Sequence, residues 1–251
     1  MSKHLLILDS GHAKNTAGKK AFDNSFYEWD FNNKMQYALK KRAEEHGITV
    51  KLTNPDPGTV KDISLTTRAT TANNFYKSLN NPKAVMVSLH ANAYGSNWNA
   101  ARGVEVYHAL NASNNSKNLA KYICDNIYSN VKAIDTGFKN RGVKCQDFTV
   151  IYKTITPTCL VEYGFYSNKD DLKILKNNQN ELVEATLKGI CKYFNINYQE
   201  PKKEVVKTNS TASNIYYRVV AGSYTNKTNA DKLVSELKSK GYPAFIDIYK
   251  K

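Results

Sequence analysis

Long apolar runs are missing from this sequence of 251 residues. No apolar stretch approaches the roughly 20 residues that a membrane-spanning helix needs, which excludes an integral membrane segment. The N-terminal region has only four consecutive apolar residues, at positions 5–8, whereas a secretory signal peptide needs about 7–15. We therefore expect a soluble chain without a signal peptide, made in the cytoplasm of the producing cell.

Cysteines are few and form no recognisable motif. The sequence has neither a C-x-x-C pair nor a zinc-ribbon spacing among Cys124, Cys145, Cys159 and Cys191. Cys159 lies in an apolar stretch and Cys191 on the apolar face of a predicted helix, which is typical of buried free thiols. In a chain without a signal peptide, this favours reduced cysteines over a disulfide framework.

Acidic residues are outnumbered: 22 Asp and Glu stand against 36 Lys and Arg, a formal net charge of +14. Such a surplus favours a polyanionic partner, such as nucleic acid, an anionic membrane surface or an acidic cell wall. The sequence contains no block of five or six consecutive basic residues. Solvated lysines on an ordinary surface explain the charge equally well, so the charge alone does not name the partner.

The residues that are present suffice for a folded core, since 41% are apolar and 11% aromatic. Strands are predicted at 4–8, 48–52, 84–89, 103–107, 148–151 and 158–162. Helices are predicted at about 28–46, 64–79, 116–131 and 179–194. Alternating strands and helices, with several uninterrupted apolar strands, predict an α/β fold whose central, mostly parallel sheet is flanked by helices.

The chain divides into two predicted domains. A first domain covers 1–198, and a polar linker with little hydrophobic periodicity follows at 199–214. The remaining residues, 215–251, predict a small β-α-β unit with strands at 216–221 and 244–249 around a helix at about 229–239.

Two histidines directly follow predicted strands: His12 comes after strand 4–8 and His90 after strand 84–89. Ligands of parallel α/β sheets gather beyond the carboxyl ends of the strands. Imidazole suits zinc, and a carboxylate would complete a catalytic site with one position open for water. The contexts of the other histidines fit this role less well.

Two carboxylates are candidates for this chemistry. Glu28 lies sixteen residues after His12, but Ser25-x-x-Glu28 also matches a helix capping box, which the spacing alone favours. Glu162 lies inside an apolar strand, where an unpaired charge costs several kcal/mol on the order of a desolvation penalty. Glu162 is therefore paired, protonated or functional, and burial would raise its pKa toward that of a general acid or base.

Several segments resemble, in the correct order, the motifs of the zinc-dependent N-acetylmuramoyl-L-alanine amidases. The segments are 8–12, Glu28 at a helix start, 64–73, 88–92, 103–107 and 161–168. The resemblance covers about residues 4–195. It implies that His12, Glu28 and His90 bind Zn²⁺ and that Glu162 is the catalytic carboxylate, which overrides the capping interpretation of Glu28.

The resemblance also implies the reaction: hydrolysis of the amide bond between N-acetylmuramic acid and L-alanine in bacterial peptidoglycan. Zinc would activate water, and Glu162 would act as general base and acid. Asn92 is interpreted as a site-orienting, substrate-binding or loop amide, and Arg68 as a salt-bridge residue rather than a substrate contact. Tyr163 and Phe165 are predicted core residues.

Residues 217–245 resemble one repeat of a SPOR-type peptidoglycan-binding domain, which normally has two repeats. The half repeat predicts either a homodimer, through pairing with a second chain, or docking on the catalytic domain. The setting is then a phage endolysin or a mother-cell autolysin that causes cell lysis after the membrane opens, and the sequence leaves both open.

Two other functions fit parts of the sequence. A zinc-dependent peptidoglycan peptidase or deacetylase would use the same site on a different bond. A basic nucleic-acid-binding protein would interleave aromatic and basic residues on one face. The sequence has no such concentration and that function leaves His12, His90 and Glu162 unexplained, so no nucleic-acid partner is expected.

Overall fold

The computed structural model describes residues 3–58, 62–80, 82–201, 221–242 and 244–246. The chain divides into two compact units, 1–201 and 202–251. The boundary between them falls within the predicted linker. None of the helices in these described ranges is long and apolar enough to cross a membrane.

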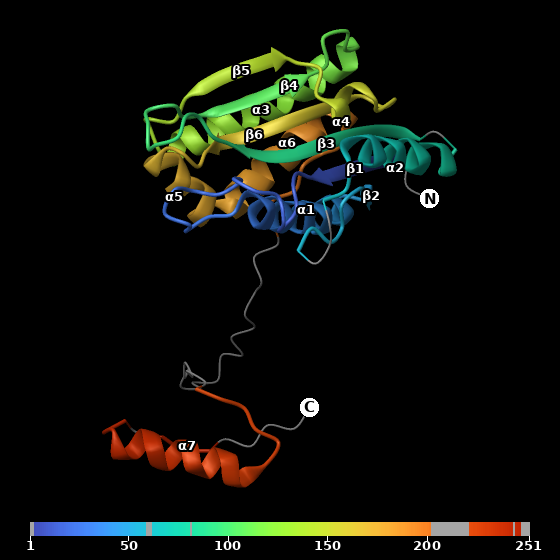
Figure 1. Ribbon diagram of the computed structural model, residues 1–251. Coiled ribbons are helices and arrows are strands. Elements are labelled where there is room, and N and C mark those ends of the chain that lie inside the picture. The colour runs from blue at the N-terminus through green and yellow to red at the C-terminus, as the bar shows by residue number, and fades with distance from the viewer. Residues whose placement is uncertain (1–2, 59–61, 81, 202–220, 243, 247–251) are drawn as a thin grey trace. The chain divides into compact units, whose positions relative to one another are not determined.

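A six-stranded sheet forms the centre of the first unit, with the strand order β2-β1-β3-β6-β4-β5 (Figure 1). The strands are β1 (His4–Ser10), β2 (Thr49–Leu52), β3 (Lys83–Asn92), β4 (Val104–His108), β5 (Asn140–Cys145) and β6 (Thr158–Phe165). Neighbouring strands are parallel except for β4 and β6, which pair antiparallel. The expected central, mostly parallel sheet is confirmed.

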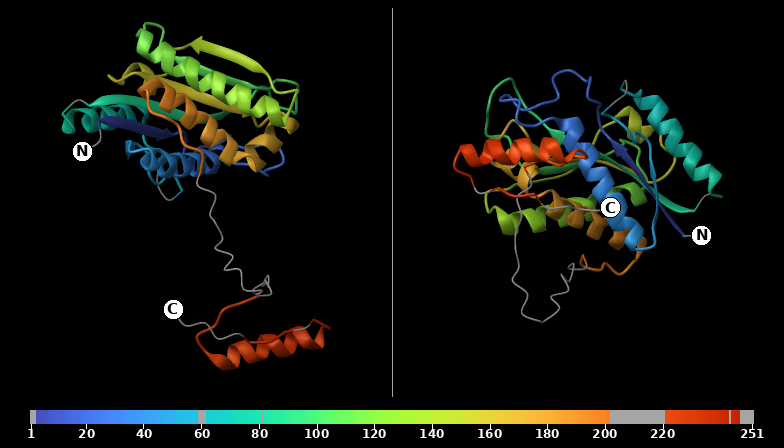
Figure 2. Two further views of the ribbon diagram at one scale, coloured as in Figure 1. Left: turned by 180° about the vertical axis from the view of Figure 1, so that it is seen from behind. Right: turned by 90° about the horizontal axis from the view of Figure 1, so that it is seen from below.

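Helices cover both faces of this sheet. They are α1 (Glu28–Glu45), α2 (Leu65–Ser78), α3 (Asn114–Ile134), α4 (Thr149–Tyr152), α5 (Lys169–Asn177) and α6 (Gln179–Phe194). Helices α1, α3 and α6 contribute to the larger buried cluster, whereas α2 and α4 contribute to the smaller one on the other face. Seen from behind, α3 and α6 run across the sheet (Figure 2).

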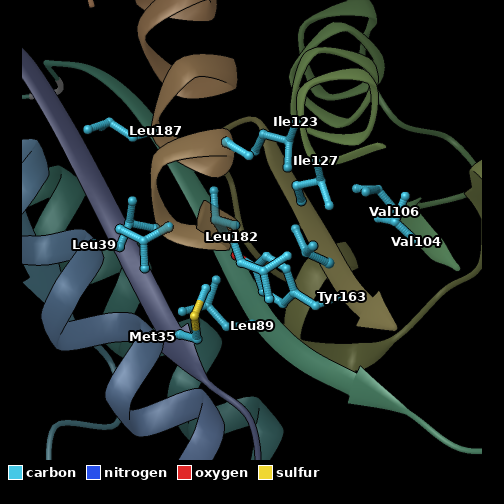
Figure 3. Packing of buried hydrophobic residues seen from close by; sticks show 14 of the residues in the cluster. Met35, Leu39, Leu89, Val104, Val106, Ile123, Ile127, Tyr163, Leu182 and Leu187 are labelled. Atoms are coloured by element: carbon cyan, nitrogen blue, oxygen red, sulfur yellow. The ribbon is translucent and has the colours of Figure 1, made fainter. Parts of the chain in front are cut away.

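The central strands are buried on both faces, which explains their uninterrupted apolar sequences. In β1, Leu6 and Leu8 enter the larger cluster, and Leu5 and Ile7 enter the smaller one, because successive side chains of a strand point to opposite faces. Figure 3 shows the larger cluster, in which side chains from α1, α3 and α6 meet those of β3 and β6. The predicted core position of Tyr163 is confirmed there.

The predicted strand at 148–151 is wrong, because residues 149–152 form the short helix α4. Val150 and Ile151 of this helix are buried in the smaller cluster. A short apolar run has the same hydrophobic pattern in a buried strand and in a buried helical turn. The sheet edge is instead β5, whose mostly polar and partly exposed sequence gave no strand signal.

In the second unit the structure describes the helix α7 (Lys227–Ser239), which begins two residues before the predicted helix. The Asn226 side chain caps it by accepting a hydrogen bond from the Thr228 amide. Of the two predicted strands, 216–220 and 247–249 lie outside the described residues, and the described parts, Ala221 and 244–246, are not in a strand.

Candidate metal centre and active site

His12 lies in the turn that directly follows β1, and its φ of 62° places it in the left-handed region. The residue before it must be glycine for a steric reason. A Cβ atom on Gly11 would lie 2.1 Å from Cε1 of His90, a separation that no structure tolerates. The absence of a side chain at Gly11 therefore lets the turn after β1 pass directly against the imidazole near the end of β3.

Glu28 is the first residue of α1 and reaches both histidines. Its Oε1 lies 3.3 Å from Nε2 of His12 and 3.0 Å from Nδ1 of His90. The same oxygen accepts a hydrogen bond from the Ala91 amide at 3.3 Å. The residue before the helix is Tyr27, which makes no side-chain capping bond. The capping box that the spacing suggested for Ser25 and Glu28 is therefore absent, because the histidines occupy the Glu28 carboxylate.

The side chains of His12, Glu28 and His90 offer three ligand atoms that all lie within 4.8 Å of one another. Burial by itself would raise the pKa of Glu28, but hydrogen bonds with His12 and His90 outweigh it and lower the pKa to about 2. The carboxylate is therefore ionised at neutral pH. Two imidazole nitrogens and one carboxylate oxygen form a donor set that fits zinc and leaves a coordination position open.

A buried ion pair lies beneath the turn that carries His12. The Asp9 carboxylate accepts hydrogen bonds from the hydroxyls of Thr53 at 2.5 Å and Ser88 at 2.7 Å. Arg68, 1% exposed, contacts the same carboxylate and also pairs with Asp62 at 2.5 Å. Arg68 therefore makes the structural salt bridge that the sequence suggested. Too little of its side chain is exposed for a contact with substrate.

Two asparagines hold the backbone of the same turn. Asn54 Nδ2 donates to the carbonyl oxygens of Ser10 at 2.8 Å and His12 at 3.0 Å. Asn32 Nδ2 donates to the carbonyl of Gly11 at 3.1 Å. No motif in the sequence singled out these asparagines. For Asn32 there was a signal, since it lies four residues after Glu28 and hence on the same side of α1.

Glu162 lies on β6 beside the candidate metal ligands. Its register partner on the adjacent strand β3 is His90. The side chain is partly buried, and its Oε2 atom is fully buried without a hydrogen-bond partner among the described residues. Burial raises the pKa of Glu162 well above its usual range, and the negative charges of Glu28 and Glu105 raise it further. Such a carboxyl group keeps its proton to a higher pH than an ordinary glutamate does.

Glu105 lies on the far side of Glu162 from His90. It is the register partner of Glu162 on β4, and its Oε1 accepts a hydrogen bond from Asn92 Nδ2 at 2.7 Å. Asn92 also accepts a hydrogen bond from the Ala93 amide through its Oδ1 atom. Asn92 thus bridges the end of β3 to β4, and Glu105 is a site neighbour to which the sequence analysis gave no role.

A family model for N-acetylmuramoyl-L-alanine amidases matches residues 6–192 of this chain. The chain belongs to this amidase family. It is 31% identical over 215 residues to an endolysin of Bacillus phage SPP1, covering 81% of this chain and 72% of the endolysin. A sporulation-specific N-acetylmuramoyl-L-alanine amidase of Bacillus subtilis (strain 168) is 25% identical and is covered to 83%, with 96% of this chain aligned.

The fold of the amidase unit also matches solved structures. The crystal structure of an N-acetylmuramoyl-L-alanine amidase from Clostridium difficile 630 aligns with a TM-score of 0.67 and 28% identity. The alignment covers 78% of this chain and 98% of that protein. A second family model, for the SPOR domain, matches residues 202–251. Both resemblances inferred from the sequence are therefore confirmed.

The remaining histidines of the amidase make other contacts. His46 accepts a hydrogen bond from the Gln199 amide at its Nε2, and its Nδ1 lies 2.8 Å from the carbonyl oxygen of Arg42. The Nδ1 of His108 lies 2.8 Å from the carbonyl oxygen of Ala109. The ring of His4 packs against Phe194.

All four cysteines of the amidase are free, with Cys145 exposed and the other three buried. The expected reduced state of the thiols agrees with this geometry.

Proposed function

We propose that this amidase is a zinc enzyme that hydrolyses the bond between N-acetylmuramic acid and L-alanine in bacterial peptidoglycan. The observation that carries the proposal is the convergence of His12, Glu28 and His90 from three separate elements, with Glu162 in register beside His90. Membership of the family supports the amide bond as the bond that is hydrolysed. The donor set supports zinc as the metal, and the position of Glu162 supports its role in proton transfer.

Nε2 of His12, Nδ1 of His90 and the Glu28 carboxylate would hold the zinc ion. When bound, zinc supplies a Lewis acid that polarises the scissile carbonyl and lowers the pKa of water toward about 7. Glu162 takes up a proton from the attacking water and later delivers it to the leaving nitrogen. The raised pKa of Glu162 suits the delivery step, because the carboxyl group keeps its proton until it is transferred to the leaving nitrogen.

Product analysis on purified peptidoglycan tests the proposal. Native enzyme, chelator-treated enzyme, zinc-restored enzyme and Glu162→Gln are compared, with the exposed Glu181→Gln as the matched control. We expect new L-alanine amino termini without new reducing sugars. These products should be lost on chelation and restored by zinc, and they should be absent in Glu162→Gln but present in Glu181→Gln. Other new termini would indicate a peptidase, and released acetate would indicate a deacetylase. Activity unaffected by chelation and by Glu162→Gln would overturn the proposal.

We further propose that the second unit binds peptidoglycan and joins two chains. The SPOR match over 202–251 supports the wall contact. None of the residues of α7 is buried, although Leu233 and Leu237 lie on one side of it. Sedimentation velocity of the full chain should give a dimer that Leu233→Asp with Leu237→Asp converts to a monomer. A native monomer would contradict pairing, and unchanged sedimentation of the variant would contradict the role of α7.

The amidase is proposed to stay in the cytoplasm of the producing cell until the membrane opens and then to degrade the wall. Its similarity to an endolysin supports this sequence of events. Fractionation of producing cells before and after membrane permeabilisation tests it. The amidase should move from the cytoplasmic to the wall fraction only after permeabilisation, and its presence at the wall beforehand would contradict the proposal.

A further inference from the structure

A buried carboxylate next to the active site gathers two cations. Glu105, 2% exposed, accepts hydrogen bonds from Asn92 and from the Tyr107 hydroxyl, each at 2.7 Å. It also accepts hydrogen bonds from Arg141 Nε at 2.6 Å and from the Lys144 ammonium. Two positive charges thus surround one negative charge. The cluster retains one net positive charge.

The two cations are fixed in place but remain accessible. The Arg141 and Lys144 side chains are each 36% exposed. The guanidinium of Arg141 lies 4.8 Å from the centre of the Phe165 ring, and the Lys144 ammonium lies 5.8 Å from that of Tyr107. The terminal nitrogens of Arg141 donate no hydrogen bond to any residue that the structure describes. Donors for an anion are therefore available and already oriented.

The sheet register places this cluster beside Glu162. Across neighbouring strands, His90 pairs with Glu162, and Glu162 pairs with Glu105. Neighbouring strands lie about 4.8 Å apart. The cationic groups gathered at the Glu105 carboxylate therefore lie about one strand spacing from Glu162. They lie on the opposite side of Glu162 from the metal ligands.

We propose that Arg141 and Lys144 form a carboxylate-binding subsite for the stem peptide, held in place by Glu105 as a positioning residue. This inference rests on the proposed amidase reaction, in which the scissile carbonyl lies at the metal ligands and the leaving nitrogen at Glu162. The peptide on the leaving side then extends toward β4 and β5. The anionic group of the stem peptide that binds there is identified by its charge and by its distance from the scissile nitrogen.

The second residue of bacterial stem peptides is a glutamate linked through its side chain, which leaves its α-carboxyl group free or amidated. In an extended peptide this group lies about 6–7 Å from the scissile nitrogen, at 3.3–3.6 Å per residue. That distance reaches the Arg141 and Lys144 side chains from Glu162. A planar guanidinium binds a carboxylate through two parallel hydrogen bonds, so the free acid is the preferred substrate.

The test uses two soluble disaccharide tripeptides that differ only in whether this α-carboxyl group is free or amidated. The kcat/KM of each is measured for the native chain, Arg141→Gln, Lys144→Gln and Lys121→Gln. Lys121 is an exposed lysine on α3 that pairs with Asp125, so its variant changes the net charge equally. Thermal unfolding of each variant confirms that it is folded.

We expect the native chain to prefer the free acid by about tenfold, mainly through KM, with a smaller preference at high salt. Arg141→Gln should remove most of this preference by slowing only the free acid. Lys144→Gln should remove part of it, and Lys121→Gln none. Equal native rates on the two substrates, or an equal loss on both in Arg141→Gln, would overturn the subsite. Failure of the native chain to hydrolyse whole peptidoglycan would instead overturn the proposed function.

Discussion

Two carboxylates of the candidate active site, Glu28 and Glu162, lie in opposite electrostatic surroundings. Glu28 contacts two imidazoles and a backbone amide, and its pKa falls to about 2. Glu162 has a buried oxygen without a partner among the described residues and two acidic neighbours, and its pKa rises. Hydrogen-bond donors at Glu28 keep its carboxylate charged, which suits the metal-ligand role proposed for it. The lack of a partner at the buried Glu162 oxygen favours the protonated form, which suits the proposed proton transfer.

The largest effect should separate these two roles. His90→Ala removes a ligand, so we expect both zinc content and activity to fall to background. Glu162→Gln leaves the three ligands in place, so zinc content should stay near one ion per chain while kcat falls by about 10²–10⁴, the usual worth of a general acid or base. Metal analysis and product release on the same samples check both. Loss of zinc in Glu162→Gln would break the comparison.

The ion pair between Asp9 and Arg68, near the candidate metal ligands, can be broken separately. Arg68→Ala leaves the buried Asp9 carboxylate without its cation, and breaking a buried pair in this way costs about 3–5 kcal/mol. Urea unfolding should show this loss. Asp62, the other partner of Arg68, is 36% exposed. Asp62→Asn should therefore cost no more than about 1 kcal/mol. Equal losses in the two variants would contradict the structural role assigned to Asp9.

Stability against pH gives a further contrast. Because folding raises the pKa of Glu162, its charged form opposes folding above the ordinary value near 4.5. Glu162→Gln should therefore stabilise the metal-free chain at neutral pH by roughly 0.5–2 kcal/mol, a common gain when a functional site is relaxed. The gain should vanish below pH 4.5, where the group is protonated in both states. Denaturant unfolding at neutral and acidic pH tests this.

The same sign argument runs the opposite way for Glu28. Its lowered pKa stabilises the folded metal-free chain above pH 4.5, and this contribution disappears as the pH falls toward 2. Glu28→Gln should therefore be destabilising at neutral pH, where Glu162→Gln is stabilising. A common sign for the two variants would show that the contrast between the two carboxylates is not real.

The smallest effect concerns the start of α1. Because the Ser25 side chain does not cap this helix, Ser25→Ala should change the free energy of unfolding by less than about 0.5 kcal/mol. Ser113 does cap α3, through a hydrogen bond from the Ser116 amide, so Ser113→Ala should cost about 0.5–2 kcal/mol. Chemical denaturation of both variants tests the difference. A large effect at Ser25 would restore the capping interpretation.

Patterns of sequence predicted most of the amidase fold, but they misassigned residues 149–152 and missed both the strand β5 and the helix α5. Apolar strands and amphipathic helices were recognisable because their burial repeats along the chain. Residues 149–152 were misassigned because a buried helical turn of β-branched residues has the composition of a strand. β5 was missed because an edge strand faces solvent and needs little apolar sequence.

The sequence by itself determined the order of most elements and the place where His12 follows β1, because local periodicity marks where a strand ends. His90, which was predicted to follow its strand, lies inside β3, two residues before the end of that strand. Only the tertiary structure decided that Glu28 contacts both histidines rather than capping its helix, since that choice depends on atoms 16 and 62 residues away in the chain. Only the sheet register placed Glu105, with Arg141 and Lys144, beside Glu162. Long-range pairing brings such groups together, and local sequence carries no record of it.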